Sequence, residues 1–164
     1  MGYTAPPTVA TGDFITAAIW NTHLKDNIIE LDARTTVSSA EALGVGTTTS
    51  NPYVTATTVA GPVVVANLLA STRVMVTNSA KLENNTAFGV SFIGVGITGA
   101  ATIPASDGMC IYYQAPSAGQ SIQVGSVYTF GTGVAGSTTF SEKVRVNSGT
   151  GTFASRRLSV TSLG

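Results

Sequence analysis

Short stretches in which apolar and polar side chains alternate follow one another from about residue 51 to the end of the chain. Alternation with a period of two is typical of β-strands that have one buried face. In the last stretch, Phe153, Leu158 and Val160 are expected to point inward and Arg157 outward. The predicted strands, rich in β-branched or aromatic residues, are Tyr53–Val59, Val63–Leu69, Arg73–Asn78, Ala87–Ile97, Met109–Gln114, Ser121–Phe130, Thr138–Val146 and Phe153–Thr161.

A helical pattern precedes these stretches. Thr16 is a good N-cap residue, and Trp20, Leu24, Ile28 and Leu31 follow at spacings of four, four and three. This spacing predicts one amphipathic α-helix with a large apolar stripe. A helix of this length is only marginally stable alone in water, so the stripe requires a partner.

Two partners for this stripe stay open. The helix packs either on its own β-domain or a neighbouring protein, or on copies of itself. Trp20, Leu24, Asn27 and Leu31 also fit coiled-coil spacing, with Asn27 as the polar residue that sets the register. In both cases the attachment or oligomerisation surface is expected to consist of Trp20, Leu24, Asn27, Ile28 and Leu31.

The remaining N-terminal segments complete the predicted architecture. Residues 1–12 contain Pro6 and Pro7 and are expected to form an extended arm, and residues 35–50, rich in Thr, Ser, Gly and Ala, a linker. We therefore expect a mainly β protein in two parts. Residues 1–50 form the arm, helix and linker, and residues 51–164 form an antiparallel, jelly-roll-like β-sandwich.

Composition points to a protein that acts through contacts. Charged residues make up 10% of the chain, against about 25% in ordinary soluble domains. The formal net charge is zero, so nothing in the overall charge attracts nucleic acid or an anionic membrane, and self-association is favoured. The single cysteine excludes an intrachain disulfide, and no apolar run reaches the length of a membrane span.

Candidate chemistry is sparse. The only histidine, His23, falls on the predicted helix, and Cys110 falls in an apolar strand, where a buried, unreactive thiol is expected. The carboxylates beyond the N-terminal part are Glu83, Asp107 and Glu142, and Asp107 beside Gly108 is typical of a turn. We therefore expect no catalytic, cofactor-binding or metal-binding residues and no enzyme activity.

Two further motifs have structural explanations. Gly94, Gly96 and Gly99 match the GxGxxG pattern of dinucleotide sites, but no helix is predicted after them, so the glycines are expected to serve bends or close packing. Arg156 and Arg157 are adjacent in a predicted strand and should point to opposite faces, which does not make a nucleic-acid platform.

The segment from Gly12 to Arg34, GDFITAAIWNTHLKDNIIELDAR, resembles a signature found near the N-termini of many structural proteins of tailed bacteriophages. The matching positions are Gly12, Asp13, Ile15, Thr16, Ala17, Ala18, Trp20, Asn21, Lys25, Asp26, Asn27 and Leu31. Trp20 stands where Leu is usual and Lys25 where Arg is usual. The C-terminal GTFASRRLSVTSLG resembles the closing strand of small virion β modules.

This resemblance implies a non-enzymatic virion protein, assembled in the host cytoplasm. The first hypothesis is a capsid decoration or head-surface protein, a homotrimer that contacts itself and the major capsid or tail proteins. The alternative is a tail or fibre component that binds a host-surface glycan, with Tyr112, Tyr113 or Tyr128 as candidate contacts. Neither hypothesis requires a cofactor, nucleic acid or a membrane.

Overall fold

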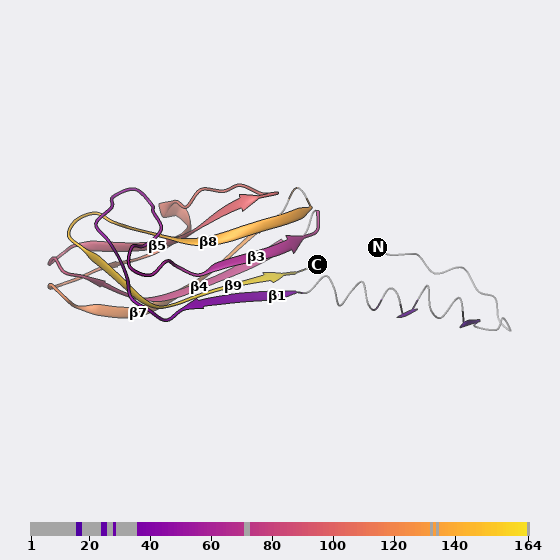
Figure 1. Cartoon of the computed structure of the whole chain (residues 1–164), viewed down its shortest axis with the longest axis horizontal. Coiled ribbons are helices and arrows are strands. Elements are labelled where there is room, and N and C mark those ends of the chain that lie inside the picture. The colour runs from indigo at the N-terminus through magenta and orange to yellow at the C-terminus, as the bar shows by residue number, and fades with distance from the viewer. Residues whose placement is uncertain are drawn as a thin grey trace.

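A computed structural model of the 164-residue chain describes residues 16–17, 24–25, 28, 36–70, 73–131, 133 and 135–163. Within these residues, strands form two antiparallel sheets that face each other (Figure 1). The strands are β1 (Val37–Ala42), β2 (Gly46–Thr48), β3 (Val63–Leu68), β4 (Arg73–Asn84), β5 (Val90–Gly99), β6 (Cys110–Gln114), β7 (Ser121–Gly131), β8 (Gly136–Val146) and β9 (Gly151–Ser162). A short 3₁₀ helix, Asp107–Met109, precedes β6.

The strand order confirms the antiparallel, jelly-roll-like sandwich. Sheet A has the order β1-β9-β4-β7, with β2 also paired to β9, and sheet B has the order β3-β8-β5-β6. The chain crosses between the two layers after β2, β3, β4, β6, β7 and β8. Apart from β5 and β6, which follow one another, the neighbouring strands in each sheet come from distant parts of the sequence, so the fold is held mainly by long-range pairing.

Two expected segments are wrong. The residues expected to form a linker contain β1 and β2, which both pair with β9. Conversely, Tyr53–Val59 was expected to be a strand but is a connection between β2 and β3 with isolated bridges at Val54 and Thr57. Local composition did not identify Val37–Ala42 as a strand, because this segment is a strand through its pairing with β9, more than 100 residues away.

The expected N-terminal helix is not supported by the part of the chain that the structure describes. The arm and most of the helix positions lie outside the described residues, and the described positions Thr16, Ala17, Leu24, Lys25 and Ile28 are too few to define a helix.

The core lies between the sheets in two clusters of apolar side chains. The larger cluster includes Phe140 from β8 and Leu158 and Val160 from β9, and the smaller one includes Phe153. The prediction that Phe153, Leu158 and Val160 point inward is confirmed, since each is at most 1% exposed. Burying a side chain of this size contributes roughly 1.5–3 kcal/mol to stability.

An irregularity in β9 changes which side chains face the core. The pairing register between β4 and β9 shifts between Ser79 and Lys81, and on β9 Ser155 has a φ of 49°. This β-bulge adds one residue to β9, so Arg156 points between the sheets while Arg157 points to solvent. The two arginines therefore do face opposite sides, as predicted, and the bulge decides which of them is buried.

The bulge gives a test of local strain. We expect Ser155→Val to lower the free energy of unfolding by about 1 kcal/mol, because a β-branched residue is disfavoured at positive φ. Ser155→Gly should leave stability within about 0.5 kcal/mol, and Ala154→Val, where φ is not positive, should also have little effect. Urea unfolding measures all three, and an unchanged Ser155→Val protein would contradict the strain.

Candidate functional site

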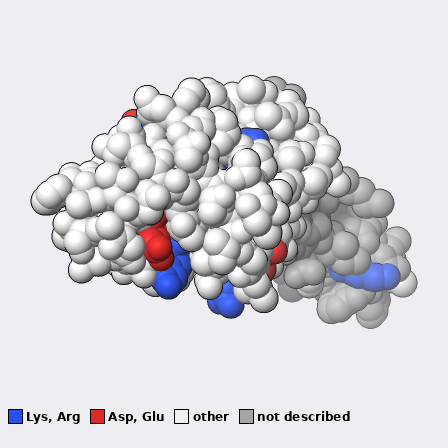
Figure 2. All heavy atoms as spheres, turned by 60° about the vertical axis from the view of Figure 1, so that its left-hand side comes forward, with Lys and Arg blue, Asp and Glu red and all other residues white. Residues whose placement is uncertain are grey.

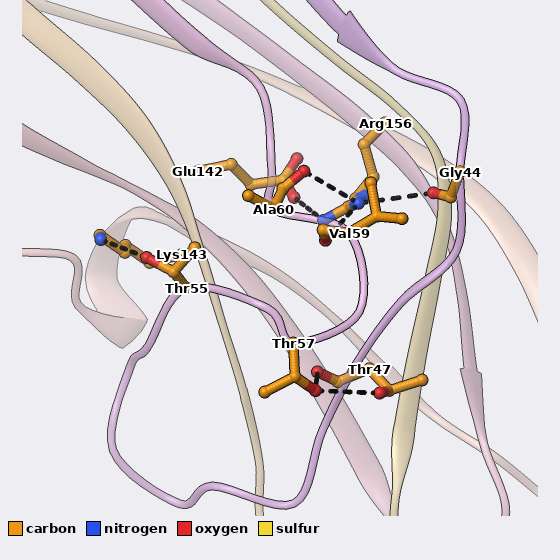
Figure 3. Close-up of polar contacts among 9 residues, drawn as sticks. All are labelled: Gly44, Thr47, Thr55, Thr57, Val59, Ala60, Glu142, Lys143 and Arg156. Carbon is orange, nitrogen blue, oxygen red and sulfur yellow. Dashed lines mark hydrogen bonds and ion pairs between the residues drawn. The ribbon is translucent and has the colours of Figure 1, made fainter.

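A buried ion pair joins the two sheets (Figure 3). The Arg156 Nη1 of β9 donates a hydrogen bond to Glu142 Oε1 of β8 at 3.3 Å, and neither side chain has exposed area. Arg156 Nη2 also donates to the carbonyl oxygens of Val59 at 2.9 Å, Ala60 at 3.2 Å and Gly44 at 3.4 Å. One guanidinium therefore fastens both connections that flank β2 to the sandwich.

The ion pair is closely packed, and some of its polar atoms have no hydrogen-bond partner. Arg156 Nε and Glu142 Oε2 have no hydrogen-bond partner among the described residues. Burial raises the pKa of the Glu142 carboxyl to about 7, although the Arg156 charge acts in the opposite direction. A Cβ at Gly46 would come within 2.8 Å of Arg156 Nη1, and a Cβ at Gly61 within 2.8 Å of Glu142 Oε1. The two glycines therefore make room for the pair.

A second polar cluster lies on the outer face of sheet B. Arg145 Nε donates to Asp107 Oδ1 at 2.9 Å, and Arg145 Nη2 forms an ion pair with Asp107 Oδ2. The Tyr53 hydroxyl donates to the same Asp107 Oδ1 at 3.0 Å. The Arg145 guanidinium lies 3.7 Å from the ring centroid of Phe92 and 5.4 Å from that of Tyr53. This network fixes the Tyr53 ring on the sheet.

The charges in this network shift the titration of two groups. Hydrogen bonding from Arg145 lowers the pKa of the Asp107 carboxyl below its usual range. Burial raises the pKa of the Tyr53 hydroxyl, with Cys110 and Asp107 acting in the same direction. Asp107, expected as a turn residue, thus opens the 3₁₀ helix and also forms an ion pair.

A groove of about 480 Å³ lies beside this cluster. Its lining is mostly apolar with a few polar groups and includes Tyr53, Gly96, Ile103, Pro104, Ser141 and Lys143. The main chains of Ile97 and Ile103 exchange two hydrogen bonds of 2.8 and 3.0 Å, which hold one wall against β5. Lys143 Nζ donates to Thr55 Oγ1 at 2.9 Å (Figure 3). We refer to this feature as the sheet B groove.

In the part of the chain that the structure describes, each flank of the sandwich ends in two edge strands, β1 and β3 at one flank and β6 and β7 at the other. Among the described residues, β6 pairs only with β5, and β7 pairs only with β4. The eleven residues of β7 include no charged side chain, and Ile122 and Val127 are 42% and 60% exposed. Tyr112 on β6 is 66% exposed. We refer to these two strands as the β6–β7 flank.

Charged groups are sparse beyond this flank as well. Figure 2 shows one face of the molecule on which Lys, Arg, Asp and Glu appear only at a few separate places. Such a surface can be covered by another protein with little cost in charge desolvation.

The residues predicted from the helical stripe are only partly described. Leu24 and Ile28 are 41% and 64% exposed, whereas Trp20, Asn27 and Leu31 lie outside the described residues. Their role as an attachment or oligomerisation surface stays a prediction. His23 also lies outside the described residues.

The other predicted side chains have mixed outcomes. Tyr112 is exposed, but Tyr113 packs against the smaller core cluster, and the Tyr128 hydroxyl is buried. Cys110 was expected to be buried and is only half-buried, because β6 is an edge strand. Gly94 and Gly96 lie in β5, which Gly99 ends at a φ of 108°, as expected for packing and a bend.

Sequence reasoning missed the Arg156–Glu142 pair and the fixed Tyr53 ring. The only available signal for the pair was an arginine and a glutamate placed among apolar residues of two predicted strands. The outward position of Arg157 was predicted, but the sequence did not indicate that Arg156, on the opposite face, is fully buried against Glu142. The Tyr53 ring depends on Asp107, which lies 54 positions away.

The described residues were also compared with the requirements of a metal site and of a membrane span. They contain no group of three or more His, Cys, Asp or Glu side chains that could hold a metal ion. No helix in that part of the chain is long and apolar enough to span a membrane.

Comparison with known proteins establishes the fold. No protein-family model and no curated protein matches the chain. Among solved structures, the Eiger TNF of S. frugiperda is 10% identical with a TM-score of 0.53, covering 80% of this chain and 94% of that chain. A structure of infectious bursal disease virus, Gt strain, is 13% identical with a TM-score of 0.51, covering 78% of this chain and 33% of that chain. The chain therefore has a jelly-roll-like fold similar to those of a TNF protein and a viral particle protein.

Proposed function

We propose that this chain is a non-enzymatic structural subunit of a tailed-bacteriophage particle, a capsid decoration or head-surface protein that acts as a homotrimer. The open β6–β7 flank is the observation that carries the proposal of an assembled subunit. The phage assignment rests on the resemblance of residues 12–34 to the N-terminal signature of phage structural proteins. Its partners are then other copies of the chain and the major capsid or tail proteins.

The β6–β7 flank supports assembly on physical grounds. Soluble monomers usually protect a long edge strand with charged residues, proline or a covering segment. In β7, eleven consecutive residues have no charge and no proline, and their outer edge pairs with no described strand. We take a second copy of this chain as the occupant, because an uncharged edge can approach another copy without repulsion between like charges.

A contact of standard size would be enough to hold copies of the chain together. A standard interface buries about 1,600 Å² in total, with an apolar centre and a polar rim. The exposed Ile122, Val127 and Tyr112 supply the apolar part on the β6–β7 flank. Repetition of this contact around a threefold axis would close a ring.

A matched pair of lysine variants tests this surface. Val127→Lys on β7 should convert the oligomer to single chains, because it places a charge in the apolar contact. Val65→Lys on β3, at the opposite edge of the sandwich, should leave the mass unchanged, since Val65 is 59% exposed and Val127 60%. Light scattering coupled to size-exclusion chromatography gives the mass. Equal masses for the two variants would contradict an interface on the β6–β7 flank.

Addition of the purified chain to undecorated phage shells tests the virion role. We expect the chain to sediment with the shells, and a chain carrying Trp20→Asp and Leu24→Asp to stay in the supernatant while its sandwich remains folded. Val65→Lys is the control and should sediment with the shells. A wild-type chain that ignores shells of every candidate phage would overturn the head-surface assignment.

The alternative function is a tail or fibre component that binds a host-surface glycan. The sheet B groove is the observation that favours it, because a concave, mostly apolar surface with a few fixed polar groups is typical of small-ligand sites. Binding of the labelled chain to a panel of bacterial surface polysaccharides tests this function. Binding to none of them would leave the decoration role alone.

A further inference from the structure

We propose that the sheet B groove binds an acidic saccharide, with the sugar carboxylate on Lys143 and one face of the sugar ring against Tyr53. The inference rests on the alternative, receptor-binding function, and it names the ligand class and the residues that bind it. It does not depend on whether the chain lies on the head or the tail of a particle.

The size of the groove fits a small ligand. Its volume of about 480 Å³ lies within the range of roughly 300–1,000 Å³ that small-molecule sites occupy. Gly96 contributes to its floor without a side chain, and Ile103 and Pro104 form an apolar wall opposite polar groups of β8. A sugar ring, with apolar C–H faces and a polar rim, matches this division.

Tyr53 is a fixed aromatic surface. Its hydroxyl is bonded to Asp107, its Cε1 lies 3.3 Å from the position a Gly94 Cβ would take, and Arg145 lies 5.4 Å from its ring centroid. The face of an aromatic ring is electronegative and attracts the weakly positive C–H groups of a sugar. Because the ring is already held in place, binding orders no further side chain at this position.

Lys143 determines the charge of the ligand. Its ammonium group forms a hydrogen bond with Thr55 but no ion pair with any described carboxylate. The neighbouring cation, Arg145, is neutralised by Asp107, and the carboxyl of Glu142 lies between the sheets with Arg156. The groove therefore presents one uncompensated positive charge, which a carboxylate would satisfy with a charge-assisted hydrogen bond.

The remaining polar groups suit sugar hydroxyls. The Ser141 hydroxyl donates to the Gly96 carbonyl oxygen at 3.3 Å, which leaves its oxygen lone pairs available as acceptors. Thr98 and Thr102 also line the groove and can donate or accept. Neutral hydroxyls at these positions and a single cation at Lys143 favour a saccharide with one acidic group over a polyanion.

Two sugars distinguish the contribution of the carboxylate to binding from that of the sugar ring. We expect the full chain to bind methyl β-glucuronide at least tenfold more tightly than methyl β-glucoside, which has the same ring without the carboxylate, as measured by NMR titration. Lys143→Gln should reduce glucuronide affinity to the level of the glucoside. Lys81→Gln, an exposed lysine on sheet A, is the matched control and should change neither affinity.

Two variants at Gly96 test the location of the site. A Cβ at Gly96 meets no atom closer than 3.5 Å, so Gly96→Ala should fold normally, and Gly96→Val should fill the floor and abolish binding of both sugars. Thermal unfolding confirms that each variant is folded.

The outcomes distinguish the ligand class from the receptor function. Equal affinity for the two sugars, lost in Gly96→Val, would overturn the acidic ligand but keep a saccharide receptor. Glucuronide binding that survives both Lys143→Gln and Gly96→Val would overturn the groove as the site. Failure to bind either sugar, together with binding of the chain to surface polysaccharides in the panel, would overturn this inference and leave the receptor function standing; failure in both assays would overturn both.

Discussion

Arg156→Ala is expected to lower the free energy of unfolding by about 3–5 kcal/mol at pH 8, the range observed when one partner of a buried ion pair is removed. The substitution leaves the Glu142 carboxylate without its cation and removes the donors to the carbonyl oxygens of Val59, Ala60 and Gly44. It also opens a cavity where the largest fully buried side chain of the described residues lies. Urea unfolding followed by circular dichroism measures the loss.

The adjacent arginine provides the control for this prediction. Arg157 pairs with Glu41 at 3.1 Å on the surface of sheet A, and its side chain is 64% exposed. Exposed ion pairs contribute about 0–1 kcal/mol, so Arg157→Ala should have a small effect. Equal losses for the two variants would contradict the inward position of Arg156 and the bulge that creates it.

A double substitution separates the cost of the unpaired charge from the value of the pair. Glu142→Leu combined with Arg156→Met removes both charges and keeps much of the volume, and we expect it to be more stable than Arg156→Ala alone. A double variant less stable than Arg156→Ala would show that the unpaired charge of Glu142 is not the main cost of removing Arg156.

Stability is expected to fall by about 2–3 kcal/mol between pH 5 and pH 8 because of Glu142. Burial raises the pKa of this carboxyl from 4.5 to about 7 in the folded chain. The folded state therefore holds the proton more strongly than the unfolded state, which favours folding at low pH. This stabilisation is complete below pH 4.5 and is lost as the pH rises through about 7.

Comparison of two pH profiles isolates this contribution. Denaturant unfolding of wild type and Glu142→Gln at pH 5, 6, 7 and 8 should show that the variant lacks the decline, since every other titrating group is common to both. Glu41→Gln, an exposed carboxyl on β1, should keep the wild-type slope. A wild-type difference that is flat, or that rises with pH relative to Glu142→Gln, would show that Arg156 holds the carboxylate ionised.

The alternating pattern predicted the sandwich and most of its strands, because a strand with one buried face has apolar residues at every second position of its own sequence. Phe153 and Leu158 are examples, since their apolar character alone identified the inward side of β9. This local pattern is weaker in a segment that is a strand mainly because a distant strand pairs with it. Ser38 and Ser39 of β1 have little strand preference of their own, and they are in a sheet because β9 lies beside them.

The chemistry of the candidate site was less predictable than the fold. Tyr53, Asp107 and Arg145 are distant in sequence, and their cluster exists only after the connection between β2 and β3 folds onto the outer face of sheet B. Gly94 and Gly96 were expected to serve bends or close packing, and both lie in β5, but the place of Gly96 in the lining of a groove followed only from the arrangement of β5 and β8.

The mass of the wild-type chain in solution tests the central claim, that the sandwich acts as a subunit through the β6–β7 flank. Native mass spectrometry or sedimentation equilibrium of the full chain should give the mass of three 16.6 kDa chains over a wide range of concentration. A mass of one chain at every concentration, up to that at which the chain decorates shells, would contradict it.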